Sequence, residues 1–131
     1  MTTFPDSHKD FLDFPVATLT TIGDDGFPQS TLVWFLHEDG ELKLSLNTAR
    51  LKLKNLRKRP QTSVLIMDPN DQMRYLEVRG TARIEDDPGK TFAQRLGAKY
   101  NADVSAYDAP GVERAVVTIE PKNIYAVDMN G

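Results

Sequence analysis

A short basic segment is the part of this sequence whose residue types most clearly suggest chemistry. Six of the sixteen Lys and Arg residues lie between Arg50 and Arg59, a stretch without any Asp or Glu. The rest of the chain therefore carries ten basic against nineteen acidic residues, a net charge of −9, although the whole chain is only at −3. Positive charge concentrated in this way is typical either of a solvated helix face or of a binding site for an anion.

The same segment predicts where an anion would bind. The pattern indicates a helix over residues 50–59, with Asn47 or Thr48 as its N-cap. Free backbone N–H groups at a helix N-terminus attract phosphate, and Arg50 and Lys52 would add a planar fork and a point charge there. We therefore expect a phosphorylated or otherwise acidic small ligand. Nucleic acid is not expected as a partner, because the acidic remainder would repel it and no nucleic-acid-binding motif is present.

Other catalytic chemistry has little material in this chain. Cysteine is absent, which excludes thiol nucleophiles and disulfides, and His8 and His37 are the only histidines. Ser7 beside His8 is not expected to form a catalytic pair, because neighbours in the chain seldom face one another correctly. His37-Glu38-Asp39 is better explained as a turn than as a metal site, so no metal is predicted. No catalytic residue can be assigned from these patterns.

The strand around Trp34 presents apolar groups on both of its faces. Val33 and Phe35 flank this tryptophan, and alternate residues of a strand point to opposite sides. One face then packs on the core, while the other contacts either a partner subunit or a planar ring system. In the second case the hydroxyls of Ser30 and Thr31 would bind the heteroatoms of the ring. Both interpretations remain open at this stage.

The elements that must position these residues are mostly strands. Alternation is strict over 41–47, where Leu42, Leu44 and Leu46 share one face, and turn residues separate this strand from its neighbours. Pro121 is expected to interrupt the last stretch, because proline breaks a strand ladder. The predicted strands are 15–22, 27–37, 41–47, 62–67, 73–84, 112–120 and 123–127.

Three helical segments complete the predicted architecture, at 7–14, 50–59 and 88–100. No linker, repeat or low-complexity tract divides the chain, so residues 1–131 are predicted to form a single domain. No apolar run approaches the ~20 residues that span a bilayer, and the N-terminus is unlike a secretory signal. Together with the absence of cysteine, this favours a soluble cytoplasmic protein without a membrane partner.

Several motifs together resemble a known family. They are Gly26-Phe27-Pro28-Gln29-Ser30-Thr31-Leu32-Val33-Trp34-Phe35, Leu44-Ser45-Leu46-Asn47-Thr48, Arg50-x-Lys52-x-x-Asn55-Leu56 with Pro60, and Val78-Arg79-Gly80-Thr81-Ala82. Their order and spacing resemble the pyridoxamine 5′-phosphate oxidase-like FMN-binding split barrels, in particular the flavin/deazaflavin oxidoreductases that use coenzyme F420. The resemblance runs from about residue 15 to residue 84. It implies a mainly β fold with minor α, a six- to seven-stranded antiparallel split β-barrel with two or three short helices.

The resemblance also implies a site and an assembly. The chain would form a homodimer with its cofactor at the subunit interface, and a small molecule would be the substrate. Arg50, Lys52 and Lys54 would hold the phosphate or acidic tail of the cofactor, and the ring would lie along the second and third strands. The implied ring-contacting residues are Ser30, Thr31, Leu32, Val33, Trp34, Leu46, Asn47, Thr48 and Val64.

The function implied by the resemblance is hydride transfer from reduced coenzyme F420 to an electron-poor unsaturated small molecule. The cofactor then supplies the reactive atom and the protein supplies orientation, so no dedicated catalytic residue is required. Oxidation of a vitamin is not expected, because the chain lacks the C-terminal Arg and His segment with which the vitamin oxidases bind their substrate. Three alternatives remain open: an FMN-dependent oxidoreductase of the same fold, a non-catalytic flavin, deazaflavin or haem binder, and a dimeric β-domain that contacts an acidic protein.

Overall fold

The computed structural model describes residues 2–131, which form one antiparallel sheet with short helices around it. The sheet has seven strands, so the predicted mainly β architecture is confirmed. None of the helices in this part of the chain is long and apolar enough to cross a bilayer. In chain order the elements are η1 (Asp6–Asp13), β1 (Ala17–Ile22), β2 (Pro28–Val33), β3 (Leu36–Glu38), β4 (Glu41–Asn47), α1 (Leu51–Lys58), β5 (Gln61–Asp68), β6 (Asp71–Asp86), η2 (Pro88–Lys90), α2 (Thr91–Tyr100) and β7 (Arg114–Asp128).

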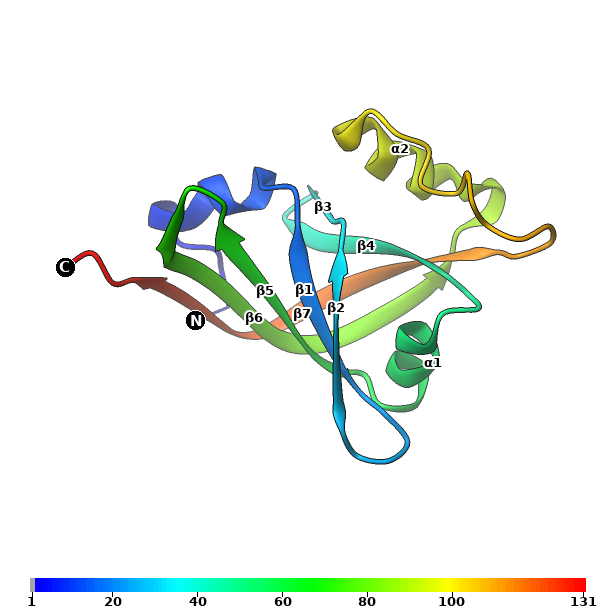
Figure 1. Ribbon diagram of the computed structural model, residues 1–131, viewed down its shortest axis with the longest axis horizontal. Coiled ribbons are helices and arrows are strands. Elements are labelled where there is room, and N and C mark those ends of the chain that lie inside the picture. The colour runs from blue at the N-terminus through cyan, green and yellow to red at the C-terminus, as the bar shows by residue number, and fades with distance from the viewer. Residues whose placement is uncertain (1) are drawn as a thin grey trace.

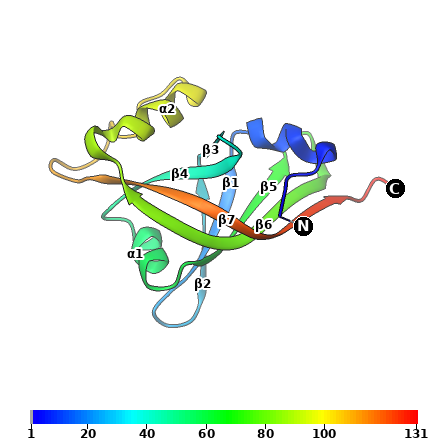
Figure 2. The same ribbon diagram turned by 180° about the vertical axis from the view of Figure 1, so that it is seen from behind.

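The order of the strands leaves the barrel open along one seam. The spatial order is β2-β1-β5-β6-β7-β4-β3, so β2 and β3 are the two edges of the sheet although only Trp34 and Phe35 separate them in the chain. The sheet curls until these edges approach one another (Figure 1, Figure 2). The short strand β3 pairs with β4 only as far as Lys43. Beyond that residue, the free edges of β4 and β2 face each other across the seam.

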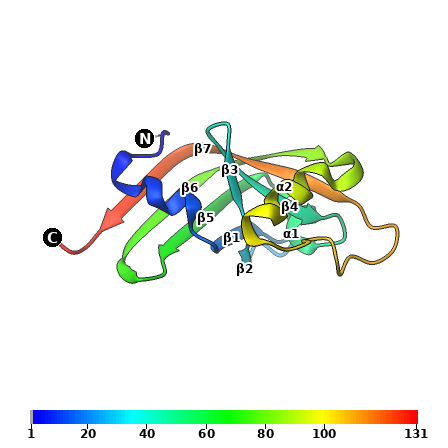
Figure 3. The ribbon, with the colours of Figure 1, turned by 90° about the horizontal axis from the view of Figure 1, so that it is seen from above.

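The inside of the curl is the hydrophobic core. Leu42, Leu44 and Leu46 are buried, as their alternation predicts, and β1, β5, β6 and β7 contribute further aliphatic side chains. Phe11 of η1 closes one end of this core, where its side chain is fully buried. Helix α1 closes another end, with Leu53 and Leu56 packed into the core. Helix α2 lies outside the sheet and packs against β4 and β7 (Figure 3).

Two of the predicted strand boundaries are wrong. The predicted strand over 27–37 is divided into β2 and β3, because the chain must cross from one sheet edge to the other at Trp34 and Phe35. The two predicted strands after residue 112 are instead one strand, which passes through Pro121 without interruption. The register between β6 and β7 shifts at Arg79 and Gly80, and Gly80 pairs with Pro121 at this irregularity. A bulge tolerates proline, because the regular ladder bond is already absent there.

The helices also differ from the prediction in detail. Asn47 and Thr48 are not the N-cap of α1; Arg50 has that position, and the Asn47 side chain accepts the Ala49 N–H instead. The predicted helix over 88–100 begins in a 3-10 turn, and its regular part starts at Thr91. The buried carboxylate of Asp87 caps this part by accepting the backbone N–H groups of residues 92 and 93, at 2.9 and 3.0 Å. The segment over 7–14 is a 3-10 helix with a kink.

Candidate functional site

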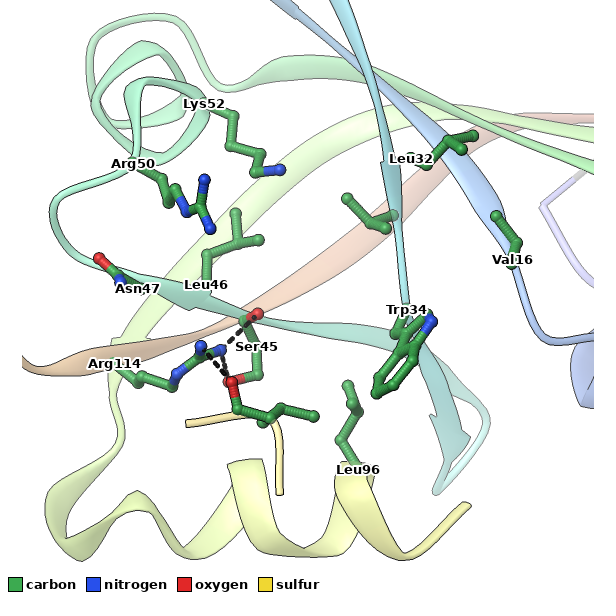
Figure 4. A pocket seen from close by; sticks show the side chains of 12 residues that line it. Val16, Leu32, Trp34, Ser45, Leu46, Asn47, Arg50, Lys52, Leu96 and Arg114 are labelled. Carbon is green, nitrogen blue, oxygen red and sulfur yellow. Dashed lines mark hydrogen bonds between the residues drawn. The ribbon is translucent and has the colours of Figure 1, made fainter. Parts of the chain in front are cut away.

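A cavity of about 490 Å³ lies at the open seam of the barrel. Strands β2 and β4 form two of its walls, and α1 and α2 lie at its two ends (Figure 4). Its polar and apolar residues are on different sides, since Arg50, Lys52, Asn47 and Arg114 stand opposite Val16, Leu32, Trp34 and Leu96 in Figure 4. The complete lining is Val16, Leu32, Val33, Trp34, Ser45, Leu46, Asn47, Arg50, Lys52, Leu96, Val104 and Arg114.

Two cations on the polar side have no carboxylate partner within residues 2–131. Among the described residues, Lys52 donates only to the Thr31 hydroxyl, at 3.2 Å. Burial lowers the pKa of Lys52, and the charge of Arg50 lowers it further. No hydrogen bond or ion pair of the Arg50 side chain is present in the described part of the chain, and its guanidinium points into the cavity (Figure 4). Two adjacent cations that repel one another favour the binding of an anion, which would relieve this repulsion.

The third cation of the wall, Arg114, is already neutralised. Its Nε and Nη2 atoms each donate to Asp108 at 2.9 Å, and its Nη1 atom donates to Ser45. These hydrogen bonds, with help from Asn47 and Lys90, lower the pKa of Asp108 to about 2. Both members of the ion pair are almost completely buried. The cluster therefore fixes the loop over 101–113 against β4, and it leaves Arg50 and Lys52 as the cations available to a ligand.

The apolar side is built around Trp34, at the crossing between the two sheet edges. The indole stacks on the ring of Tyr100 with 4.1 Å between ring centroids and 5° between ring planes. The Tyr100 hydroxyl donates to the Pro15 carbonyl at 2.7 Å and accepts the Phe35 N–H at 3.0 Å. Lys99 donates to the Phe35 carbonyl, so the last turn of α2 satisfies the backbone where no strand partner exists.

The structure brings together seven of the twelve residues that the sequence placed at a ligand site. Those that line the cavity are Leu32, Val33, Trp34, Leu46, Asn47, Arg50 and Lys52. The other five lie elsewhere: Ser30 bonds to Thr20 on the outer face of the sheet, Thr31 contacts Lys52, Thr48 and the exposed Lys54 stand outside the wall, and Val64 is fully buried in the core.

Five lining residues were not predicted from the sequence: Val16, Ser45, Leu96, Val104 and Arg114. Ser45 alternates with buried leucines, so the sequence predicts that it lies on the other face of β4. The sequence does not predict that this face lines a cavity. Leu96 and Val104 reach the cavity because α2 and the following loop fold back over β4. No local pattern encodes that return.

The two histidines are both used in packing. Ser7 and His8 share a hydrogen bond, with 2.9 Å between Oγ and Nδ1. The other ring nitrogen of His8 donates to the Val127 carbonyl, so no carboxylate orients this pair. His37 packs edge-on against Phe4. Within residues 2–131 no three metal-ligating side chains lie close enough together to hold an ion.

Comparison with known proteins identifies the family. The sequence pattern of the pyridoxamine 5′-phosphate oxidase family matches residues 4–128, nearly the whole chain. The chain belongs to the pyridoxamine 5′-phosphate oxidase family. Membership in this family confirms the split-barrel resemblance. No curated protein sequence matched the chain.

Several solved structures are similar to this chain over nearly its whole length. An F420 reductase is 28% identical, with a TM-score of 0.83, over 93% of this chain and 98% of that one. A conserved hypothetical protein from Mycobacterium tuberculosis is 26% identical, with a TM-score of 0.76, over 97% and 86% of the two chains. A proposed pyridoxamine 5′-phosphate oxidase from Listeria innocua is also 26% identical, with a TM-score of 0.71, over 96% and 98%.

The residues of the cavity fit an anionic cofactor with a flat ring. Arg50 and Lys52 offer charge-assisted hydrogen bonds to phosphate or carboxylate oxygens at one side. Leu46 and Val33 offer an apolar floor beside them, and the free strand edges leave backbone N–H and C=O groups for polar ring atoms. The lining of this pyridoxamine 5′-phosphate oxidase family member thus offers contacts for both the acidic part and the flat part of such a group.

Proposed function

We propose that this chain is an oxidoreductase that uses coenzyme F420 to reduce an electron-poor unsaturated small molecule. Two findings support the proposal: the unpartnered pair Arg50 and Lys52 at the seam, and the similarity over nearly the full chain to an F420 reductase. The first of these carries it, because two free cations beside an apolar wall match an acidic redox cofactor better than they match a neutral ligand.

In this proposal the protein contributes binding and shape. In its reduced form, the coenzyme held here would provide the hydride for the reduction. Arg50 and Lys52 bind the acidic groups of the coenzyme and fix its position along the seam, while Leu32 and Trp34 exclude water from the apolar side. The hydroxyl of Ser45 is bonded to Arg114, and that of Tyr100 is bonded to backbone atoms. Because these hydroxyls are already engaged, we assign the proton of the product to solvent.

FMN is the second candidate cofactor, and the placement of Lys54 favours keeping it. Lys54 is exposed and stands outside the cavity wall, so only Arg50 and Lys52 meet a ligand inside. Two cations suffice for the single phosphate of FMN, whereas the longer acidic tail of F420 would extend outward and reach Lys54. A non-catalytic flavin or deazaflavin carrier would use the same contacts without turnover.

Titration with both cofactors tests the proposal. For the Arg50→Ala/Lys52→Ala double variant we expect the affinity for either cofactor to fall at least ~100-fold, since each charge-assisted hydrogen bond contributes ~1.5–3 kcal/mol. Lys54→Ala should weaken F420 but not FMN, and Lys122→Ala, which removes an exposed lysine elsewhere, serves as the control. Equal affinity of the wild type and the double variant for both cofactors would show that the seam is not the cofactor site.

A homodimer is part of the same proposal. The outward side chains of Leu32 and Leu65 flank Thr18 in register, and both are exposed, as are their neighbours Val16 and Met67. Because Val16 and Leu32 also line the cavity, a second copy seated on this apolar face would cover the open side of the site. Solution scattering should give a dimer at micromolar concentration, and Leu65→Glu should give a monomer with weaker cofactor binding. A wild-type monomer would contradict the interfacial site.

A further inference from the structure

The apolar side of the cavity carries a ring that is held in one orientation. Trp34 is the only tryptophan of the chain. One face of its indole is covered by Tyr100, in parallel stacking at 4.1 Å. Tyr100 is itself fixed, because its hydroxyl is bonded to backbone atoms of Pro15 and Phe35. The pair therefore forms a flat surface that loses little conformational entropy when a ligand binds to it.

The Trp34 indole is not buried in the hydrophobic core. Trp34 remains 40% exposed while it lines the cavity, and its neighbours there are Val16, Leu32 and Leu96. Figure 4 shows these side chains around the indole on the side away from Arg50 and Lys52. Aromatic rings prefer offset stacking on other rings, and aliphatic neighbours exclude water around the contact. This side of the cavity suits a planar molecule.

No charged side chain is part of the cavity lining on that side within residues 2–131. Arg114 is paired with Asp108, and the ammonium of Lys99, 5.1 Å from the centroid of the Tyr100 ring, is not part of the lining and donates to the carbonyls of Phe14 and Phe35. An anion placed on the indole would lose hydration without gaining a partner, which is costly. An uncharged molecule does not pay this cost, because it has no strongly hydrated charge to lose. The charge pattern thus separates an anionic side of the cavity from a neutral one.

We propose that Trp34 is the surface on which the acceptor of the proposed reaction stacks, and that this acceptor is an uncharged planar molecule. Tyr100 is a positioning residue, which acts by holding the indole. The inference rests on the proposed oxidoreductase function, because it assigns the remaining side of the same cavity to the second substrate. It extends that function by giving the class of acceptor and the residue that selects it.

A redox-inactive probe tests this surface without any turnover. Naphthalene-2-carboxamide is flat and uncharged, and the single indole N–H signal of Trp34 in a nitrogen–proton NMR spectrum reports binding there. We expect this signal to shift, and Trp34→Leu to weaken the probe at least ~10-fold by calorimetry, while Trp34→Phe restores most of the affinity. Tyr125→Leu, which removes an aromatic ring of equal 40% exposure outside the cavity, should change the affinity less than ~2-fold.

Two further comparisons separate planarity and charge. The saturated analogue decahydronaphthalene-2-carboxamide should bind at least ~10-fold more weakly, because it cannot stack. The anion 2-naphthoate, measured in the Arg50→Ala/Lys52→Ala variant so that those cations cannot attract it, should also bind at least ~10-fold more weakly than the carboxamide. Tyr100→Leu should weaken the carboxamide and broaden the indole signal, whereas Tyr100→Phe should preserve both, since it keeps the ring.

The outcomes distinguish this inference from the proposed function. If Trp34→Leu binds the carboxamide as well as the wild type does, or if the indole signal does not move, the stacking surface is refuted while cofactor binding through Arg50 and Lys52 stands. If neither F420 nor FMN binds the wild type, the proposed function fails, and with it the assignment of the probe site to an acceptor. Should Trp34→Leu not fold, the shift of the indole signal in the wild type and the affinity of Tyr100→Leu for the carboxamide give the same decision.

Discussion

Replacing Asp108 by asparagine is a sharp test of the ion cluster that shapes the cavity. The carboxylate accepts hydrogen bonds from Arg114, Asn47 and Lys90, and its side chain is only 5% exposed. Its pKa falls from the ordinary 3.8 to about 2, and at ~1.4 kcal/mol per pKa unit this corresponds to about 2 kcal/mol of stability at neutral pH. The variant also leaves Arg114 buried without a counter-charge, so this value is a lower bound.

The expected result has a magnitude and a pH dependence. At pH 7, Asp108→Asn should lower the unfolding free energy by about 2–3 kcal/mol in urea titrations, or the melting temperature by roughly 6–12 °C. Because the folded pKa lies below the unfolded one, the contribution of the carboxylate is complete above pH ~5 and is lost as the pH falls from about 4 to about 2. The gap between the wild type and the variant should therefore narrow over that range.

The matched control is Glu113→Gln, which removes a nearby exposed carboxylate. It should change the unfolding free energy by less than ~0.5 kcal/mol. If Asp108→Asn were no less stable than this control at pH 7, or if its deficit were the same at pH 2.5 as at pH 7, the cluster would not hold the loop over 101–113 in the way inferred from its hydrogen bonds.

Two other predictions concern single residues. Burial lowers the pKa of Lys99 from 10.5 to about 8, so between pH 8 and pH 10.5 the folded protein binds fewer protons than the unfolded chain. In this pH range the unfolding free energy of the wild type should therefore rise with pH relative to that of Lys99→Met. Parallel pH profiles of the two proteins in urea titrations would contradict this. A Cβ atom on Gly80 would lie 2.0 Å from the Glu120 carbonyl oxygen, so Gly80→Ala should cost about 3 kcal/mol or more. At Gly23 the added atom would lie 3.0 Å from the flexible Asp25 carboxylate and 3.5 Å from the Phe27 carbonyl oxygen, so Gly23→Ala should cost far less. Equal thermal stability of the two alanine variants would show that the bulge between β6 and β7 can relax.

The open seam leaves backbone groups without a strand partner, and it also forms the candidate ligand site. A closed barrel would satisfy the backbone of every strand, but here β2 and β4 each keep a free edge. Part of that edge is satisfied by Tyr100 and Lys99, which bond to Phe35 where the chain crosses between edges. The other backbone N–H and C=O groups of these free edges are available to a ligand in the cavity. The proposed cofactor and acceptor sites therefore lie where the sheet is incomplete.

Local sequence determined the strands, the basic helix and the apolar face of β4, because alternation, turn residues and charge act between neighbours in the chain. Leu42, Leu44 and Leu46 were placed in the core correctly, and Arg50 and Lys52 were expected to lie together because both fall at the start of the predicted helix, beside its free backbone N–H groups. Pro121 was misread because its tolerance depends on a bulge opposite Gly80, which belongs to another strand.

Only the tertiary structure decided which side chains contact one another at the cavity. Trp34 meets Tyr100 and Arg114 meets Asp108 only because α2 and its following loop fold back over the seam, and the first of these pairs spans 66 positions of the chain. Which cations stay free for a ligand follows from that return, since Arg114 is neutralised and Arg50 is not. The sequence gives the chemistry of each side chain directly. Whether a side chain is bonded to another residue or is left available to a ligand depends on packing between segments that are distant in the sequence.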